Sequence, residues 1–184
     1  MRSRSMMTAQ SRFMSVKVGD KVPSALLSIV KHDGQTGFSS EIVDTAEYFS
    51  NKNVVIVGYP GAFTPTCMST HIPEFIESAE KIKEQGAVDE IIALSVNDPF
   101  VVTAFAEKLG GKTLVSFAAD GNGEFTKALG LDLDLSAVQL AHRTRRSSII
   151  IKRDTIIELN DEQGAGLTEV SSAGRILEQL GKTK

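Results

Sequence analysis

The stretch Val54-Val-Ile-Val-Gly-Tyr-Pro-Gly-Ala-Phe-Thr-Pro-Thr-Cys67 decides the fold class of this 184-residue chain. Four β-branched residues open it, which is typical of a strand buried on both faces of a sheet. Pro60-Gly61 then ends the strand pattern with a turn. Apolar positions after Cys67 recur with the period of a helix. A strand pattern followed by a turn, a cysteine and a helix pattern predicts a βα unit with the cysteine between its strand and its helix.

The rest of the chain continues this alternation of strands and helices. Asn97-Asp98-Pro99 supplies an N-cap and a first helical residue, and Gly86 and Gly130 each follow a helical pattern as stop signals. Strands are predicted at 25–30, 54–59, 91–96 and 114–118, helices at 72–86, 100–109, 124–129 and 171–180, a polar turn at 31–37, and a hairpin at 147–152 and 155–159 that turns at Arg153-Asp154.

Alternating strands and helices favour parallel pairing, whereas the terminal hairpin adds antiparallel strands. We therefore predict an α/β, thioredoxin-like fold in which helices flank a central mixed β-sheet on both faces. The composition, 41% apolar and 23% charged, is typical of one soluble globular domain. The formal net charge of −3 gives no electrostatic argument for nucleic acid as a partner. No apolar stretch reaches the roughly 20 residues that span a bilayer.

The chain has one cysteine, Cys67, which excludes an intramolecular disulfide and a cysteine-based zinc site. Its three histidines, His32, His71 and His142, are too scattered to indicate a metal cluster. We expect neither a metal nor a cofactor. A free thiol also indicates a reducing compartment.

The first nineteen residues contain Arg2, Arg4, Arg12 and Lys17 but no acidic residue. This composition resembles an organellar presequence; the alternative is a short disordered tail. We assign residues 1–15 to an N-terminal extension and residues 16–184 to the domain. The predicted location is the cytoplasm or the mitochondrion.

A cysteine in the first turn of a helix is placed where backbone N–H groups stabilise a thiolate. Pro73 leaves that placement open, since the helix could instead begin near Pro73 and leave Cys67 in a loop. Cys67 could also be a buried structural residue, because free cysteine is among the most buried residue types.

The pattern Pro-x-x-x-Thr-x-x-Cys at Pro60 to Cys67 resembles the active-site motif of the peroxiredoxins, thiol peroxidases on a thioredoxin fold. Leu94-Ser-Val-Asn-Asp-Pro-Phe100 and Arg145-Arg-Ser-Ser148 are similar to stretches of their atypical branch, which contains plant type II and animal type 5 enzymes. The similarity runs from about Val16 to Leu180. It favours a kinked helix that starts before Cys67, and it implies a homodimer.

The resemblance implies four catalytic residues. The Cys67 thiolate would attack the peroxide, the Thr64 hydroxyl and the Arg146 guanidinium would hold the peroxide and the charge, and Pro60 would cover the sulfur. The same functions suit the chemistry, because charge moving to the leaving oxygen needs nearby donors.

Each of these residues also has a structural interpretation. Thr64 could cap the helix through the N–H of Thr66 or Cys67, and Pro60 could only shape a turn. Arg143 or Arg145 could replace Arg146 as the functional arginine of the basic run. His71, four residues after the cysteine, is expected to make a structural hydrogen bond and is left out of the catalytic set.

A second, resolving cysteine is missing. Animal type 5 enzymes carry one after Gly-x-Gly-Leu-Thr, where Gly164-Ala-Gly-Leu-Thr168 is followed by Glu169; plant type II enzymes carry one where Ala93-Leu94 stands. We expect a one-cysteine peroxidase acting on hydrogen peroxide and small organic hydroperoxides. Its sulfenic acid would be recycled by glutathione with glutaredoxin, or by thioredoxin.

Two other functions stay open at this point. In a redox sensor or relay, oxidised Cys67 would pass its oxidation to a partner protein. In a thioredoxin-like binding module the cysteine would be inert. A disulfide reductase of the glutaredoxin type is disfavoured, because Thr-Pro-Thr-Cys67 lacks the Cys-x-x-Cys pattern.

Overall fold

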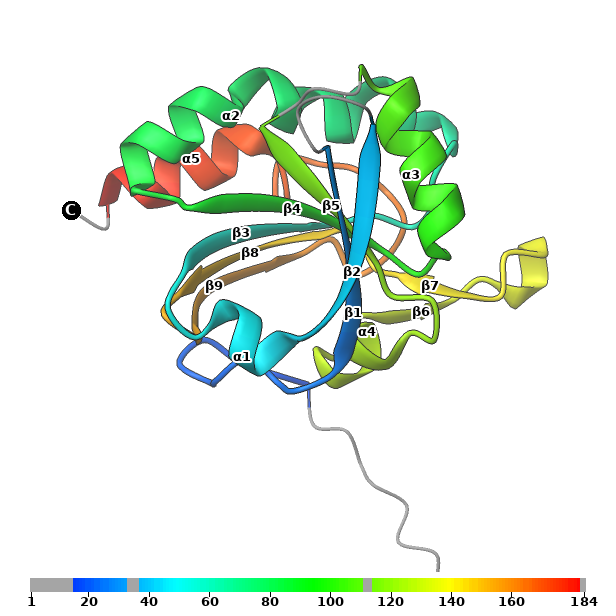
Figure 1. Cartoon of the computed structure of the whole chain (residues 1–184), viewed down its shortest axis with the longest axis horizontal. Coiled ribbons are helices and arrows are strands. Elements are labelled where there is room, and N and C mark those ends of the chain that lie inside the picture. Colours follow the sequence, from blue (N-terminus) through cyan, green and yellow to red (C-terminus); the bar gives the residue numbers. More distant parts are fainter. Residues whose placement is uncertain (1–14, 33–36, 111–113, 183–184) are drawn as a thin grey trace, which may run out of the picture.

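The computed structural model describes residues 15–32, 37–110 and 114–182. Within them a seven-stranded mixed sheet has the order β2-β1-β5-β4-β3-β8-β9 (Figure 1). Its strands are β1 (Leu26–His32), β2 (Phe38–Asp44), β3 (Asn53–Gly58), β4 (Glu90–Ser95), β5 (Val115–Ala119), β8 (Ser147–Lys152) and β9 (Thr155–Asp161). Strands β3, β4 and β5 pair in parallel, and the other pairs are antiparallel. The predicted central mixed sheet is confirmed.

Helices cover both faces of this sheet, as predicted (Figure 1). They are α1 (Thr45–Phe49), α2 (Ile72–Gly86), α3 (Pro99–Lys108), α4 (Glu124–Ala128) and α5 (Ala173–Lys182). One core cluster joins α2, α3 and α5 to one face of the sheet. A second cluster joins α1 and α4 to the other face. Because β3 and β4 contribute side chains to both clusters, they are buried on both sides.

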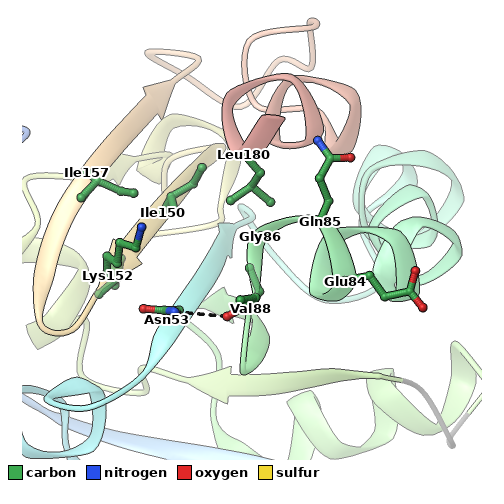
Figure 2. Close-up of a pocket in the computed structure, with 11 residues that line it drawn as sticks. Asn53, Glu84, Gln85, Gly86, Val88, Ile150, Lys152, Ile157 and Leu180 are labelled. Carbon is green, nitrogen blue, oxygen red and sulfur yellow. Dashed lines mark hydrogen bonds between the residues drawn. The ribbon is translucent and has the colours of Figure 1, made fainter. Parts of the chain in front are cut away.

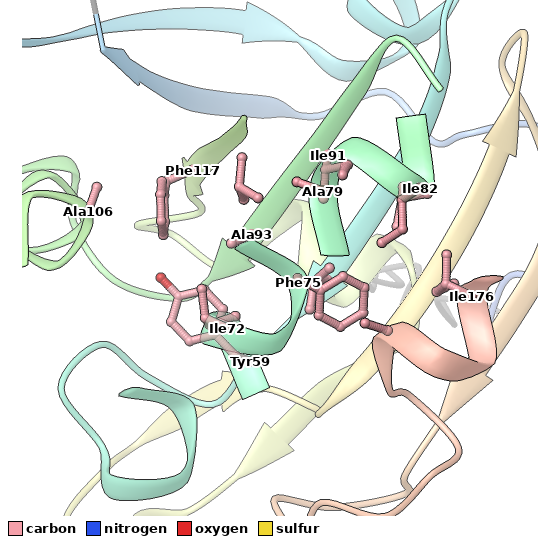
Figure 3. Close-up of a cluster of buried hydrophobic side chains, with 14 of the residues drawn as sticks. Tyr59, Ile72, Phe75, Ala79, Ile82, Ile91, Ala93, Ala106, Phe117 and Ile176 are labelled. Atoms are coloured by element: carbon pink, nitrogen blue, oxygen red, sulfur yellow. The ribbon is translucent and has the colours of Figure 1, made fainter. Parts of the chain in front are cut away.

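The apolar stripe of α2 explains why the helix lies on the sheet. Ile72, Phe75, Ala79 and Ile82 are buried, and Figure 3 shows them beside Ile91 and Ala93 of β4. Each large apolar side chain buried in this way contributes roughly 1.5–3 kcal/mol. The packing of this stripe fixes the start of α2, and therefore the residues just before it, against the sheet.

The helix that carries Cys67 begins at Pro65 and widens into a π turn, η1 (Cys67–His71), before α2. The N–H of Ile72 donates to the Cys67 carbonyl, five residues back. Pro73 gives a physical reason, because its ring would collide with the carbonyl four residues earlier in a regular α-helix. The wider turn relieves that contact. Cys67 therefore lies in the first turns of a helix and not in a loop.

Several elements were not predicted from the sequence. The polar turn expected at 31–37 is wrong for Lys31 and His32, which belong to β1, and residues 33–36 lie outside the described part. Strand β2 and helix α1 follow it. A second, two-stranded sheet pairs β6 (Asp132–Asp134) with β7 (His142–Thr144), and a 3₁₀ turn, η2 (Ser136–Val138), lies between them.

The extension assigned to residues 1–15 lies outside the described residues except for Ser15. Among the described helices, none combines the length and the apolar character needed to cross a membrane.

Candidate active site

Cys67 lies beyond the carboxyl end of β3, under the turn that joins this strand to the helix. Its side chain is fully buried, with 0% of the residue exposed. The N–H of Tyr59 donates to the Leu94 carbonyl at 3.0 Å and extends the pairing with β4 to the edge of the turn. This hydrogen bond between β3 and β4 therefore holds the start of the Pro60–Cys67 motif in place.

The turn itself is strained at Phe63, whose φ of 62° lies in the left-handed region. A bulky residue adopts this conformation only where its surroundings impose it. The Phe63 ring packs edge-on against Phe105 of α3, with ring centroids 5.3 Å apart. This contact holds the turn in the shape that presents Thr64 and Cys67.

Arg146 reaches Cys67 from the other side of the site. It precedes β8, which pairs with β3, and its Nη2 donates to the Cys67 Sγ at 3.4 Å. Only 2% of Arg146 is exposed. Its Nε donates to the Ala165 carbonyl at 3.0 Å and its backbone N–H to the Gly164 carbonyl at 3.0 Å. A buried guanidinium therefore faces the sulfur and is oriented by the 164–165 loop.

His71 binds the other terminal nitrogen of this arginine, Nη1. Arg146 Nη1 lies 2.9 Å from His71 Nδ1, and since arginine only donates, Nδ1 accepts. The ring proton is therefore on Nε2, which donates to the Ser171 carbonyl at 3.4 Å. Burial, followed by the charge of Arg146, lowers the pKa of His71 to about 4. His71 is a neutral link between the arginine and the 164–171 loop.

Thr64 makes a hydrogen bond other than the helix cap that the sequence left open as an alternative. Its hydroxyl donates to the Gly61 carbonyl at 2.8 Å and makes no bond with the N–H of Thr66 or Cys67 in the described part of the chain. The tight turn brings the Gly61 carbonyl close to the hydroxyl, so Thr64 uses its proton there and the cap considered as an alternative is not formed. Because the proton is used, the oxygen lone pairs of Thr64 are left to accept from another group.

A hollow of about 200 Å³ opens above these residues. It is lined by Pro60, Thr64, Pro65, Thr66, Leu135, Leu140, Arg146 and Ala165. Pro60, Thr64 and Arg146 thus share one small space next to buried Cys67. The structure brings all four sequence-predicted residues together.

Leu135 and Leu140 in this lining were missed by sequence reasoning. They belong to the loop between β6 and β7, where the Leu135 N–H donates to the Ala141 carbonyl at 2.8 Å. A signal was present in Leu131-Asp-Leu-Asp-Leu135, where apolar and polar residues alternate with the period of a strand. We call the segment Asp132–Thr144 the hairpin arm, because it covers one side of the hollow.

Glu162 is a second residue that the sequence did not single out. Its carboxylate accepts from the backbone N–H and the hydroxyl of both Thr168 and Ser171. The Glu162 N–H also donates to the Arg146 carbonyl at 3.0 Å. Glu162 therefore closes the loop whose carbonyls orient Arg146 and His71.

Another hollow, of about 340 Å³, lies at the opposite end of the sheet (Figure 2). It is bordered by Asn53 at the start of β3, by the end of α2, and by Leu180 of α5. Its lining contains neither cysteine nor histidine. Among the described residues, no group of histidine, cysteine and acidic side chains is placed to hold a metal ion.

A lone buried thiol against a guanidinium, at the start of a helix on a thioredoxin-like sheet, defines the class of thiol-based oxidoreductases. The family described as Redoxin matches residues 17–177. Peroxiredoxin-2B of Arabidopsis thaliana is 42% identical over 165 residues, which cover 90% of this chain and 98% of that protein. The chain belongs to the peroxiredoxin family, in its atypical branch, and it carries a single cysteine.

Further comparisons agree. The mitochondrial peroxiredoxin-2F of Arabidopsis thaliana is 40% identical over 146 residues, covering 78% of this chain and 72% of that protein. The structure of reduced Prx3 from Vibrio vulnificus in complex with hydrogen peroxide is 36% identical and superimposes with a TM-score of 0.78, covering 90% of this chain and 99% of that one. Membership of the family implies thiol-dependent peroxidase activity.

Proposed function

We propose that the protein reduces hydrogen peroxide and small organic hydroperoxides through Cys67 alone, and that an external thiol, glutathione with glutaredoxin or alternatively thioredoxin, recycles it. The observation that carries this proposal is the 3.4 Å contact of Arg146 Nη2 with the Cys67 sulfur, in a chain without a second cysteine. A fixed positive charge favours the thiolate, which is the nucleophile.

In the first half-reaction the thiolate attacks one peroxide oxygen in line with the O–O bond. The S–O bond forms as the O–O bond breaks, and the leaving oxygen departs with the electron pair as hydroxide or alkoxide. A proton converts it to water or an alcohol. Cys67 is left as a sulfenic acid, oxidised by two electrons.

Three side chains are placed to assist this step. Arg146 uses one N–H of each terminal nitrogen for Cys67 and His71, so the second N–H of each is available to a peroxide in the hollow. Thr64 can accept a hydrogen bond from the peroxide, because its own proton is bound by Gly61. Pro60 lines the same space without a donor and limits water.

In the second half-reaction an external thiolate attacks the sulfenic sulfur. The new S–S bond forms as hydroxide leaves and becomes water, which gives a mixed disulfide. A second thiol then releases Cys67 as the thiolate and leaves as the oxidised disulfide. The chain cannot close a disulfide within itself, since it has no other cysteine.

The decisive experiment is stopped-flow reaction of the reduced protein with hydrogen peroxide, with Cys67→Ser as the control. We expect a second-order rate constant at least a thousandfold above that of free cysteine, and no reaction of the control. Incubation of the oxidised protein with glutathione should then give one glutathione adduct by mass spectrometry. A rate equal to that of free cysteine would contradict the proposal and favour a binding module. A fast first step without reduction by any small thiol would favour a relay.

We also propose a homodimer, as peroxiredoxins commonly form. In support, Phe100 at the start of α3 is 84% exposed and Phe63 of the active-site turn is 47% exposed. Phenylalanine is among the aromatic residues enriched in protein interfaces. Sedimentation of the wild type and of Phe100→Ser would test it: a smaller dimer fraction in the variant is expected.

For residues 1–15 we propose either a cytoplasmic tail or a mitochondrial presequence. The basic, acid-free composition and the mitochondrial relative support the second alternative. A reporter protein fused to this segment should enter mitochondria if it is a presequence and stay in the cytoplasm if it is a tail.

A further inference from the structure

The basic run before β8 places its three arginines in three different environments. Arg146 contacts Cys67, and Arg145 binds the Asp161 carboxylate at 2.6 Å and the Gly130 carbonyl at 2.5 Å. Arg143, in β7, forms no salt bridge with any residue of the described chain. A half-buried guanidinium without a carboxylate partner is uncommon, because partial desolvation of a charge is costly.

Two contacts place Arg143 at the rim of the active-site hollow. Its Nε donates to the Leu140 carbonyl at 2.6 Å, and Leu140 lines the hollow. Its Nη1 lies against Gly61, where a Cβ would come within 2.9 Å of that nitrogen. The same Cβ position is 3.4 Å from the Thr64 Cγ2, so Arg143 and Thr64 flank one glycine.

These contacts orient the guanidinium but leave the N–H donors of its two Nη groups without a hydrogen-bond acceptor among the described residues. The Nε bond to Leu140 fixes the plane, and the Nη groups carry the donors that bind a carboxylate in bidentate fashion. The nearby acidic residues of the hairpin arm have other partners: Asp132 binds His142 at 2.8 Å, and Asp134 accepts from the Ser136 N–H at 2.8 Å.

We propose that Arg143 and the hairpin arm form a subsite for the carboxylate of the thiol that reduces oxidised Cys67. This inference rests on the proposed function and deepens it by assigning the reductant to a class, thiol peptides with a free C-terminal carboxylate. Hydrogen peroxide carries no charge and has no use for the subsite. A thiol that enters the hollow to reach the sulfur brings its flanking groups against the rim. Glutathione has such a carboxylate one residue beyond its cysteine.

The test separates the two half-reactions. The protein is oxidised with one equivalent of hydrogen peroxide and then mixed with glutathione or with its glycyl ethyl ester, in which that carboxylate is masked. Wild type should react about tenfold to a hundredfold faster with glutathione than with the ester. Arg143→Gln should reduce the glutathione rate to that of the ester, and Arg143→Lys should fall between them.

Arg153→Gln is the matched control, because it removes the same charge from the distant turn between β8 and β9. It should behave as wild type with both thiols. The rate of oxidation of Arg143→Gln by hydrogen peroxide is measured separately, and the glutathione rates are compared on protein that is fully oxidised. If the wild type itself is not oxidised, the proposed function fails, whatever Arg143 does.

Three outcomes overturn the inference while leaving the peroxidase intact. In the first, Arg143→Gln slows glutathione and its ester equally, which would show that Arg143 only supports the hairpin arm. In the second, glutathione fails to reduce the sulfenic acid, or the variant reacts with it as fast as wild type. In the third, the variant slows oxidation by a fatty-acid hydroperoxide but not reduction by glutathione, which would assign the carboxylate to the oxidant.

Discussion

Arg146 and His71 act at the residue scale as one unit. The arginine binds the sulfur and the histidine through its two terminal nitrogens, and the Ala165 carbonyl through Nε. A lysine could make one of these contacts but not all three, because only the guanidinium has donors in a fixed fork. The sequence predicted the arginine; it did not predict that a neutral histidine would hold it.

His71 should make the protein less stable as the pH falls from 6.5 to 4. Its pKa in the folded protein is about 4, below its ordinary value of 6.5, so the unfolded chain binds a proton first. Stability from this group is complete above pH 6.5 and is lost as the pH falls through that interval. The loss by pH 4 is about 3 kcal/mol, from roughly 1.4 kcal/mol per pH unit.

The measurement is urea unfolding of wild type and His71→Asn between pH 7 and 4. Asparagine keeps an acceptor for Arg146 but cannot titrate. Subtracting the two curves removes the contribution of the carboxylates that both proteins share. Parallel curves would contradict the assignment of a buried neutral imidazole.

At the element scale, the π turn at Cys67–His71 sets the direction of the sulfur. Such a turn contains one residue more than a regular α-helical turn. Deleting the exposed Thr70 should remove the extra residue of this turn, bring the Pro73 ring against the carbonyl four residues before it, and rotate the cysteine by about 100° relative to α2. The contact with Arg146 would be lost.

We therefore expect the Thr70 deletion to fold, because α2 keeps its buried stripe, and to react with hydrogen peroxide at least about tenfold more slowly. Circular dichroism would check the fold and stopped-flow the rate. A substitution that keeps the length, Thr70→Ala, is the control and should react as wild type. An unchanged rate in the deletion would show that the π turn does not orient Cys67.

Elements with a strong apolar period were the ones the sequence could predict. Strand β3 is apolar on both faces, and α2 repeats its apolar residues with a helical period. Strand β2 is exposed along most of its length and, among the described strands, pairs only with β1, so its residues carry no such pattern. The hairpin arm was missed for a different reason: Leu131-Asp-Leu-Asp-Leu135 alternates like a strand, but over five residues only, and its partner β7 has no such alternation.

The residues of the site could likewise be predicted where they lie in one continuous motif, and not where distant segments bring them together. The Pro60–Cys67 motif lies in one stretch of chain, so its spacing alone placed Thr64 near the sulfur. The Thr64 hydrogen bond to Gly61 depended on the exact shape of the turn, which propensity does not determine. Arg143 and Glu162 act through segments distant in sequence, and one sequence cannot show which surfaces meet.

At the scale of the whole molecule, a charged network lies at the other end of the sheet from Cys67. Glu90, the first residue of β4, accepts from Tyr48 at 2.8 Å and from Ser116 at 2.7 Å, and pairs with Lys31 at 2.9 Å. The Lys52 ammonium lies 3.3 Å from the Tyr48 ring centroid. Burial alone would raise the pKa of Glu90, but hydrogen bonds from Lys31, Ser116 and Tyr48 outweigh it and lower that pKa.

Glu90→Gln should lower the free energy of unfolding by about 1–3 kcal/mol at pH 7. Because the pKa of Glu90 is lower in the folded protein, its contribution is present above about pH 4.5 and is lost as the pH falls further. The difference between wild type and variant should therefore shrink at pH 3.5. Urea unfolding at the two pH values measures it. The peroxide reaction should be unchanged, and a slower one would contradict the separation of the two ends.

Strand β4 begins in the Glu90 network and ends beside the Cys67 turn, where the Leu94 carbonyl receives Tyr59. In evolutionary terms, the strand separates residues that stabilise the fold, at its Glu90 end, from residues that carry out the chemistry, at its Leu94 end. Mutations in the Glu90 network change the free energy of unfolding, whereas mutations near the Cys67 turn change the rate of the peroxide reaction directly. The stability of the protein to heat or acid can therefore evolve through substitutions at the Glu90 end of the sheet. Selection on peroxide chemistry would meanwhile conserve the Cys67 end.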